Sequence, residues 1–186
     1  GTQKIEDYLQ REYPNARVAR MDRDTTSTKG SHATILAAFS RRETDILVGT
    51  QMIAKGHDYP NVTLVGVLHA DTGLTLPDFR AAETGFQLLT QVAGRAGRGD
   101  VPGEVFIQTY RPKHFAITHA AQHDYAGFFK HELEFRQSAA YPPFRRMMNL
   151  AIEAEDLLVA ERSISQLHRL VIQHRDRLGY SGIELL

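Results

Sequence analysis

The stretch QVAGRAGRG at residues 91–99 places Arg95 and Arg98 three positions apart, between glycines. Its first two residues are the last of residues 83–92, which we expect to form a helix. A guanidinium is a permanent planar cation whose N–H groups fit phosphate oxygens in pairs. The glycines let the backbone approach and turn without steric cost. We therefore expect the two arginines to reach one triphosphate together; the alternative is a basic surface loop.

A second informative segment lies some forty residues upstream. Residues 45–50 are a short apolar, β-branched run, which predicts a buried strand. Residues 51–62 then contain Gly and Asp and lead to a second apolar run at residues 63–68. Strand, turn and strand is the layout of an α/β sheet, in which ligands bind at the carboxyl ends of the strands.

In this order and at this spacing, the two segments resemble motifs V and VI of the second RecA-like lobe of superfamily 2 helicases. Further residues, which helicases in general do not share, resemble the family of primosomal protein N′ (PriA), the bacterial replication-restart helicases. The resemblance covers most of the chain. Its segments are TQMIAKGHD (50–58), AD (70–71), LPDFRAAE (76–83), FQLLTQVAGRAGRG (86–99) and YPPF (141–144), the last fitting the join to a C-terminal domain.

The resemblance implies an α/β fold: a RecA-like lobe with a parallel sheet flanked by helices, followed by part of a small α+β domain. It implies an ATP-dependent 3′→5′ DNA helicase that recognises stalled or repaired replication forks and restarts replication by primosome assembly. The implied partners are forked and single-stranded DNA, primosome proteins and single-stranded-DNA-binding protein. ATP with Mg²⁺ would bind between this lobe and a first lobe, so the chain alone is expected to be inactive.

The resemblance also implies roles at the nucleotide. Arg95 and Arg98 would act as catalytic arginine fingers on the transferring phosphoryl group. Gln91 would orient the phosphate or couple it to DNA, unless it is only a helix-surface glutamine. Gly56 lets the backbone turn, and Asp58 is either a nucleotide ligand or a turn-forming residue.

For DNA, the candidates are Thr50, Lys55 and Arg80. The Thr50 hydroxyl at a strand end suits a phosphate contact, although threonine also favours helix N-caps. Lys55 and Arg80 are expected to contact the DNA backbone, with a solvent-facing role as the alternative. Phe79 would either stack on a base or pack in the core.

Composition limits the remaining possibilities. Lys plus Arg and Asp plus Glu both number 22, so DNA affinity must come from local patches. The chain contains no cysteine, no phosphate loop and no apolar run near the roughly 20 residues of a membrane helix. His119 and His123 are spaced like metal ligands but lack a third, so we expect no metal here. We infer a cytoplasmic protein without a membrane partner, and expect Zn²⁺ only in a cysteine-rich module of the intact protein.

The domain organisation follows from these patterns. We expect residues 1–140 to form the helicase lobe, without its first strand and the zinc module, and residues 141–186 to begin a truncated C-terminal α+β domain. Alternation over residues 148–155 predicts a half-buried strand. We expect the helix at residues 124–136 to bury Tyr125, Phe128, Phe129 and Leu133. Further helices are expected at residues 2–12, 35–39, 116–121 and 157–178, and further strands at 17–21 and 103–109.

Two other functions remain open at this point. One is a non-catalytic module that binds DNA or a primosome protein. The other is the second lobe of a different superfamily 2 translocase, which would share motifs V and VI. The KGHD box at residues 55–58 and the run PDFRAAE at residues 77–83 favour the replication-restart family over this other translocase.

Overall fold

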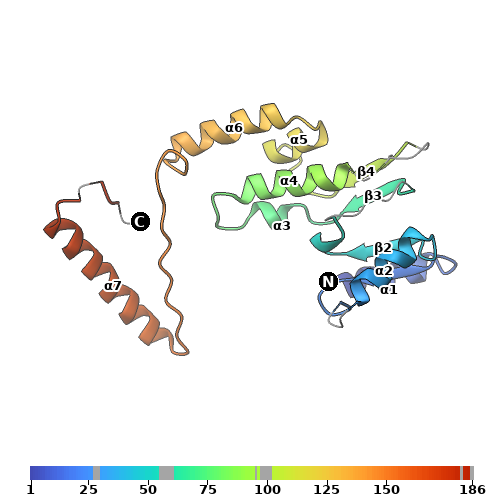
Figure 1. Cartoon of the computed structure of the whole chain (residues 1–186), viewed down its shortest axis with the longest axis horizontal. Coiled ribbons are helices and arrows are strands. Elements are labelled where there is room, and N and C mark those ends of the chain that lie inside the picture. The colour runs from blue at the N-terminus through green and yellow to red at the C-terminus, as the bar shows by residue number, and fades with distance from the viewer. Residues whose placement is uncertain (27–29, 55–60, 95, 97–101, 181, 185–186) are drawn as a thin grey trace. The chain divides into compact units, whose positions relative to one another are not determined.

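The computed structural model describes residues 1–26, 30–54, 61–94, 96, 102–180 and 182–184. It divides into two compact units, Gly1–Tyr141 and Pro142–Leu186, and each is described by itself (Figure 1). Among the residues described, no helix combines the length and the apolar character needed to cross a membrane.

The first unit begins with two parallel strands and two helices. The strands β1 (Val18–Met21) and β2 (Ile46–Gly49) pair in register from Val18↔Ile46 to Met21↔Gly49. An ion pair fixes the start of both strands, because the Arg17 guanidinium donates to both carboxylate oxygens of Asp45 at 2.9 and 2.7 Å. This contact lowers the pKa of Asp45 to about 2. The elements are α1 (Thr2–Glu12), β1 (Val18–Met21), α2 (Ser31–Ser40) and β2 (Ile46–Gly49).

A second parallel pair is formed by β3 (Leu64–Val67) and β4 (Glu104–Ile107), in register from Leu64↔Glu104 to Val67↔Ile107. Val67 and Ile107 pack against the buried helical core, whereas Leu64 and Phe106 are each 61% exposed on the alternate positions. The sheet is therefore covered by helices on one face. The elements of this part are η1 (Gln51–Ala54), β3 (Leu64–Val67), α3 (Asp71–Leu74), α4 (Ala81–Ala93) and β4 (Glu104–Ile107).

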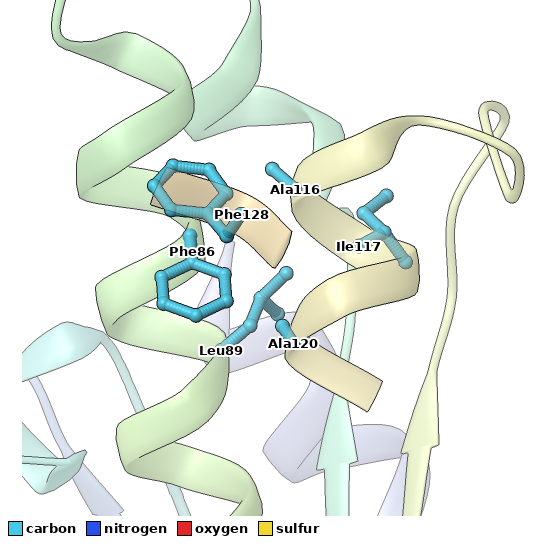
Figure 2. Packing of buried hydrophobic residues seen from close by; sticks show 6 residues of the cluster. All are labelled: Phe86, Leu89, Ala116, Ile117, Ala120 and Phe128. Atoms are coloured by element: carbon cyan, nitrogen blue, oxygen red, sulfur yellow. The ribbon is translucent and has the colours of Figure 1, made fainter. Parts of the chain in front are cut away.

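The core of the first unit lies between α4, α5 (Phe115–Ala121) and α6 (Tyr125–Ser138). At its centre the rings of Phe86 and Phe128 stack 4.0 Å apart and 8° from parallel (Figure 2). Burying one such ring stabilises the fold by about 1.5–3 kcal/mol. The cluster comprises Phe86, Leu89, Ala116, Ile117, Ala120 and Phe128. The α/β class, with parallel strands flanked by helices, is confirmed.

The α6 helix is rotated from the face that the sequence predicts. Phe128 and Glu132, one turn apart, are the buried residues, while Tyr125 and Phe129 are 66% and 52% exposed. The prediction that these two rings are buried is therefore wrong. Residues at i and i+4 share a helix face, so Tyr125 and Phe129 lie on one face of α6, and Phe128 and Glu132 lie on another. The face with Phe128 and Glu132 packs in the core.

The second unit contains α7 (Leu157–Arg177), which begins where the Asp156 carboxylate accepts a 2.7 Å hydrogen bond from the Leu158 N–H. No residue of α7 is buried. The strand predicted at residues 148–155 is absent: these residues have no strand structure, and Met148 and Leu150 are 83% and 49% exposed. Alternation marks a segment that suits a sheet, but a strand forms only when a second strand pairs with it.

Candidate nucleotide and nucleic-acid site

The backbone at the carboxyl end of β2 requires a glycine. A Cβ at Gly49 would lie 2.4 Å from the carbonyl oxygen of Met21 and 2.8 Å from the Ile53 side chain. Only glycine therefore allows β1 and the η1 turn to approach this closely. Thr50 follows at once and is exposed, and its carbonyl accepts a 3.1 Å hydrogen bond from the Ile53 N–H. The local fold thus presents Thr50 at the end of a parallel strand, where α/β sheets bind ligands.

The α4 helix carries the other half of the predicted site. Its buried face packs in the core, and Gln91 in its last turn is exposed. Gly85 permits close packing on α3, since a Cβ there would lie 2.5 Å from a Leu74 methyl carbon. The helix closes where the Gly94 N–H donates to the Thr90 carbonyl at 3.0 Å. The α4 helix, which bears Gln91, contacts η1, which directly follows Thr50.

Five of the predicted site residues lie outside the described residues. They are Lys55, Gly56 and Asp58 of the first motif, and Arg95 and Arg98 of the second. Their roles stay predictions.

The loop before α4 places Arg80 on the surface. Its side chain is 62% exposed, and its guanidinium bonds the Asp78 carboxylate at 3.1 and 3.2 Å. This contact lowers the pKa of Asp78. Phe79 beside it is partly buried, with the Arg80 and Arg136 guanidinium carbons 5.4 and 5.1 Å from its ring centre. The surroundings of this ring favour packing inside the protein over stacking on a base.

Arg136 of α6 connects this loop to α4. Its guanidinium bonds Glu83 of α4 and Glu132 of α6, each at 2.8 Å, and its side chain is 13% exposed. The Tyr141 ring at the end of the unit lies 6.0 Å from that of Phe79. The arrangement can hold α4, and with it Gln91, at a fixed distance from α6.

Asp22, at the carboxyl end of β1, was not predicted as a special residue. It is buried, and its carboxylate accepts hydrogen bonds from the Thr2 hydroxyl and from the N–H groups of Asp24 and Thr25 at 3.1 and 3.0 Å. These bonds, led by that of Thr2, lower its pKa to about 2. The only signal in the sequence is an aspartate three residues before a threonine, which suits such a turn. The carboxylate fixes the loop after β1 and ties it to α1.

Asp71 plays a similar part after β3. Its carboxylate accepts the Tyr110 N–H at 2.9 Å and the Thr109 hydroxyl at 3.0 Å. The Tyr110 bond is the main reason why the pKa of Asp71 is lowered. Asp71 therefore joins the loops at the carboxyl ends of β3 and β4.

His119, one of the two histidines with metal-like spacing, contacts a carboxylate. His119 Nδ1 lies 2.9 Å from the carboxylate of Asp124, which also accepts the Gly127 N–H at 2.8 Å at the start of α6. In the part of the chain that is described, no group of three or more metal-binding side chains comes together.

Comparison with known proteins adds to this geometry. Residues 1–100 match the helicase conserved C-terminal domain. The chain is 54% identical over 160 residues to replication restart protein PriA of Bacillus subtilis (strain 168), which covers 86% of this chain and 20% of that protein. It is 46% identical over 176 residues to the PriA of Chlamydia muridarum, covering 95% and 23%. The PriA of Synechocystis is 51% identical over 150 residues, covering 81% and 18%. The chain thus spans about a fifth of the length of these relatives.

Proposed function

This chain belongs to the PriA family of replication restart proteins and carries a helicase conserved C-terminal domain. From that premise we propose that it is the second motor lobe of an ATP-dependent 3′→5′ DNA helicase. The intact enzyme would unwind stalled or repaired replication forks and restart DNA replication by primosome assembly. The observation that carries the proposal is the contact between η1, which follows Thr50, and α4, which presents Gln91.

ATP would bind between this lobe and a first lobe. Arg95 and Arg98, just beyond the end of α4, would neutralise charge on the γ-phosphoryl group as it transfers. Gln91 would orient that phosphate, and Gly56 and Asp58 would line the nucleotide. Mg²⁺ bound together with ATP would supply positive charge that neutralises the phosphates, as in other enzymes of this chemistry. On this account the isolated chain hydrolyses no ATP.

The DNA strand would run past the carboxyl end of β2. The Thr50 hydroxyl and the Lys55 ammonium would contact its phosphates, with Arg80 as a further contact. Arg80 suits this role because its guanidinium is mostly exposed and Asp78 holds it in place. Closure of the two lobes on ATP, and opening after hydrolysis, would then move the strand.

The wider setting of the intact enzyme follows from the same premise. We propose that it acts in the cytoplasm on forked and single-stranded DNA, with primosome proteins and single-stranded-DNA-binding protein as partners. Any Zn²⁺ would be held by a cysteine-rich module elsewhere in the intact protein, because this chain contains no cysteine.

Thr50→Ala in the intact enzyme tests the division of roles. If the hydroxyl holds the translocating strand, the variant retains basal ATP hydrolysis but loses most of the stimulation by single-stranded DNA. ATP turnover measured with and without DNA gives both quantities. The control is Thr118→Ala, which removes an exposed threonine on α5 and should change neither. Loss of basal hydrolysis in Thr50→Ala, with stimulation intact, would assign Thr50 to the nucleotide instead and contradict the proposal.

A further inference from the structure

The loops that follow β3 and β4 leave the sheet side by side. Beyond the last paired residues, the Gln108 N–H donates to the Val67 carbonyl at 2.8 Å, and the Ala70 N–H donates to the Gln108 carbonyl at 3.0 Å. His69 and Tyr110 are therefore brought to the same edge, at the carboxyl ends of two parallel strands.

Tyr110 is held outward by its own backbone. Its N–H donates to Asp71, and the neighbouring Thr109 hydroxyl both donates to Asp71 and accepts the Arg111 N–H at 2.9 Å. The residue is 83% exposed. Tyr110 therefore presents an exposed ring on a backbone that these hydrogen bonds hold in place.

His69, at the same place, has an uncommon backbone conformation. It is exposed and adopts the left-handed backbone conformation, with φ at 55°. Residues other than glycine seldom adopt this conformation, although histidine adopts it more readily than most, and residues held in it cluster at functional sites. The imidazole lies 6.2 Å from the Tyr110 ring, centre to centre, with the planes 46° apart.

Two cations complete the surface. Arg111 and Lys113 follow Tyr110 in the loop before α5, and both are exposed. The one carboxylate among these loops, that of Asp71, is engaged by the two hydrogen bonds described above. Exposed aromatic rings beside Lys and Arg are the features with which proteins bind single strands without reading their sequence.

We propose that His69 and Tyr110 form a stacking platform for the bases of single-stranded DNA, flanked by Arg111 and Lys113 as phosphate contacts. The choice of ligand rests on the proposed function. The platform would lie at strand ends equivalent to the one after which Thr50 stands, so it would extend the DNA path from phosphate contacts at β2 to base contacts at β3 and β4.

The platform can be tested on the full 186-residue chain by the fluorescence anisotropy of labelled oligothymidine at low salt. Tyr110→Ala should weaken binding by about fivefold or more, because one stacked base contributes on the order of 1 kcal/mol or more. Tyr110→Phe keeps the ring and should bind like the wild type. The matched control is Tyr13→Ala, which removes a tyrosine that is 57% exposed before the opposite, amino end of β1.

Two further measurements separate base stacking from charge. On an abasic strand of equal length, Tyr110→Ala and wild type should bind alike. The double variant Arg111→Ala, Lys113→Ala should reduce the slope of log affinity against log salt by roughly 1.4, at about 0.7 per single-strand phosphate contact. His69→Asn, which tolerates the left-handed conformation but lacks the imidazole, should weaken binding of oligothymidine in the same direction as Tyr110→Ala.

The proposal is overturned if Tyr110→Ala binds oligothymidine as well as Tyr13→Ala, or if it loses equal affinity for the abasic strand. It is also overturned if the wild-type chain does not bind single-stranded DNA at low salt. None of these results decides the proposed motor function, which is tested independently by ATP hydrolysis in the intact enzyme.

Discussion

Two helical regions of this chain carry similar apolar patterns but differ in whether their apolar residues are buried. The α4, α5 and α6 helices surround a core in which Phe86 and Leu89 are each 3% exposed (Figure 2). The α7 helix repeats Ile164, Leu167 and Val171 at helical spacing, yet none of its residues is buried. Periodicity therefore indicates which face a helix can bury, and only a neighbouring element decides whether that face is buried.

The comparison extends to charged residues. Arg136 on α6 is enclosed, with its guanidinium shared between Glu83 and Glu132. Arg175 in the last turn of α7 pairs with the adjacent Asp176, whose side chain is 60% exposed. The ion pairs of Arg136 thus connect α4 and α6, whereas that of Arg175 connects two neighbouring residues of one helix. Three changes to stability would sharpen or break this contrast.

The largest effect is expected at the centre of the core. Phe86→Ala removes a ring that stacks on Phe128 and leaves a cavity, which should cost about 3–5 kcal/mol in the free energy of unfolding. Urea unfolding of the whole chain measures it. Phe129→Ala on the exposed face of α6 is the control, with an expected change within about 0.5 kcal/mol. Equal losses for the two variants would mean that α6 packs on its other face.

A smaller loss is expected from Arg136→Met. It leaves the buried Glu132 carboxylate without its partner, which should cost about 3 kcal/mol. Adding Glu132→Leu removes the unpaired charge and should restore most of the stability in the same unfolding experiment. The control Arg80→Met, at an exposed ion pair, should cost less than about 1 kcal/mol. If the double variant were no more stable than Arg136→Met, the network would not act through charge pairing.

The smallest effect is expected on α7, where Ile164 can be compared with Ile117, a buried isoleucine on α5. Ile164→Ala should change the free energy of unfolding by less than about 0.5 kcal/mol, because Ile164 is 40% exposed. Ile117→Ala on α5, at 5% exposure, should cost about 2–5 kcal/mol. A loss at Ile164 as large as that at Ile117 would show that α7 is packed against another surface in solution.

Much of the first unit could be predicted from sequence. The helix expected at residues 2–12 forms as α1, and the strands expected at residues 45–50 and 63–68 form as β2 and β3 within their predicted limits. These elements follow from local patterns that the fold then uses. Gly49 lies within the strand predicted at residues 45–50, but the sequence does not show its close approach to Met21, because that approach depends on the pairing of β1 with β2.

The errors have a common physical origin. The strand predicted at residues 148–155 and the burial predicted for Tyr125 and Phe129 both required a partner that periodicity does not identify. Asp22 was missed because one of its donors, the Thr2 hydroxyl, belongs to α1, which only the folded chain brings beside it; its other donors belong to Asp24 and Thr25. The short α3 helix was missed because four residues carry too little periodicity to detect.

The central claim, that this lobe supplies the arginines that act on the transferring phosphate, is tested most directly by ATP turnover of the intact enzyme carrying Arg98→Ala. A guanidinium that meets charge mainly in the transition state contributes to rate and not to substrate affinity. We expect kcat to fall by roughly 10³–10⁵, the range for such arginines, while fork binding stays near the wild-type value. Arg98→Lys should recover little, because an ammonium lacks the planar fork. Wild-type turnover by Arg98→Ala would contradict the claim.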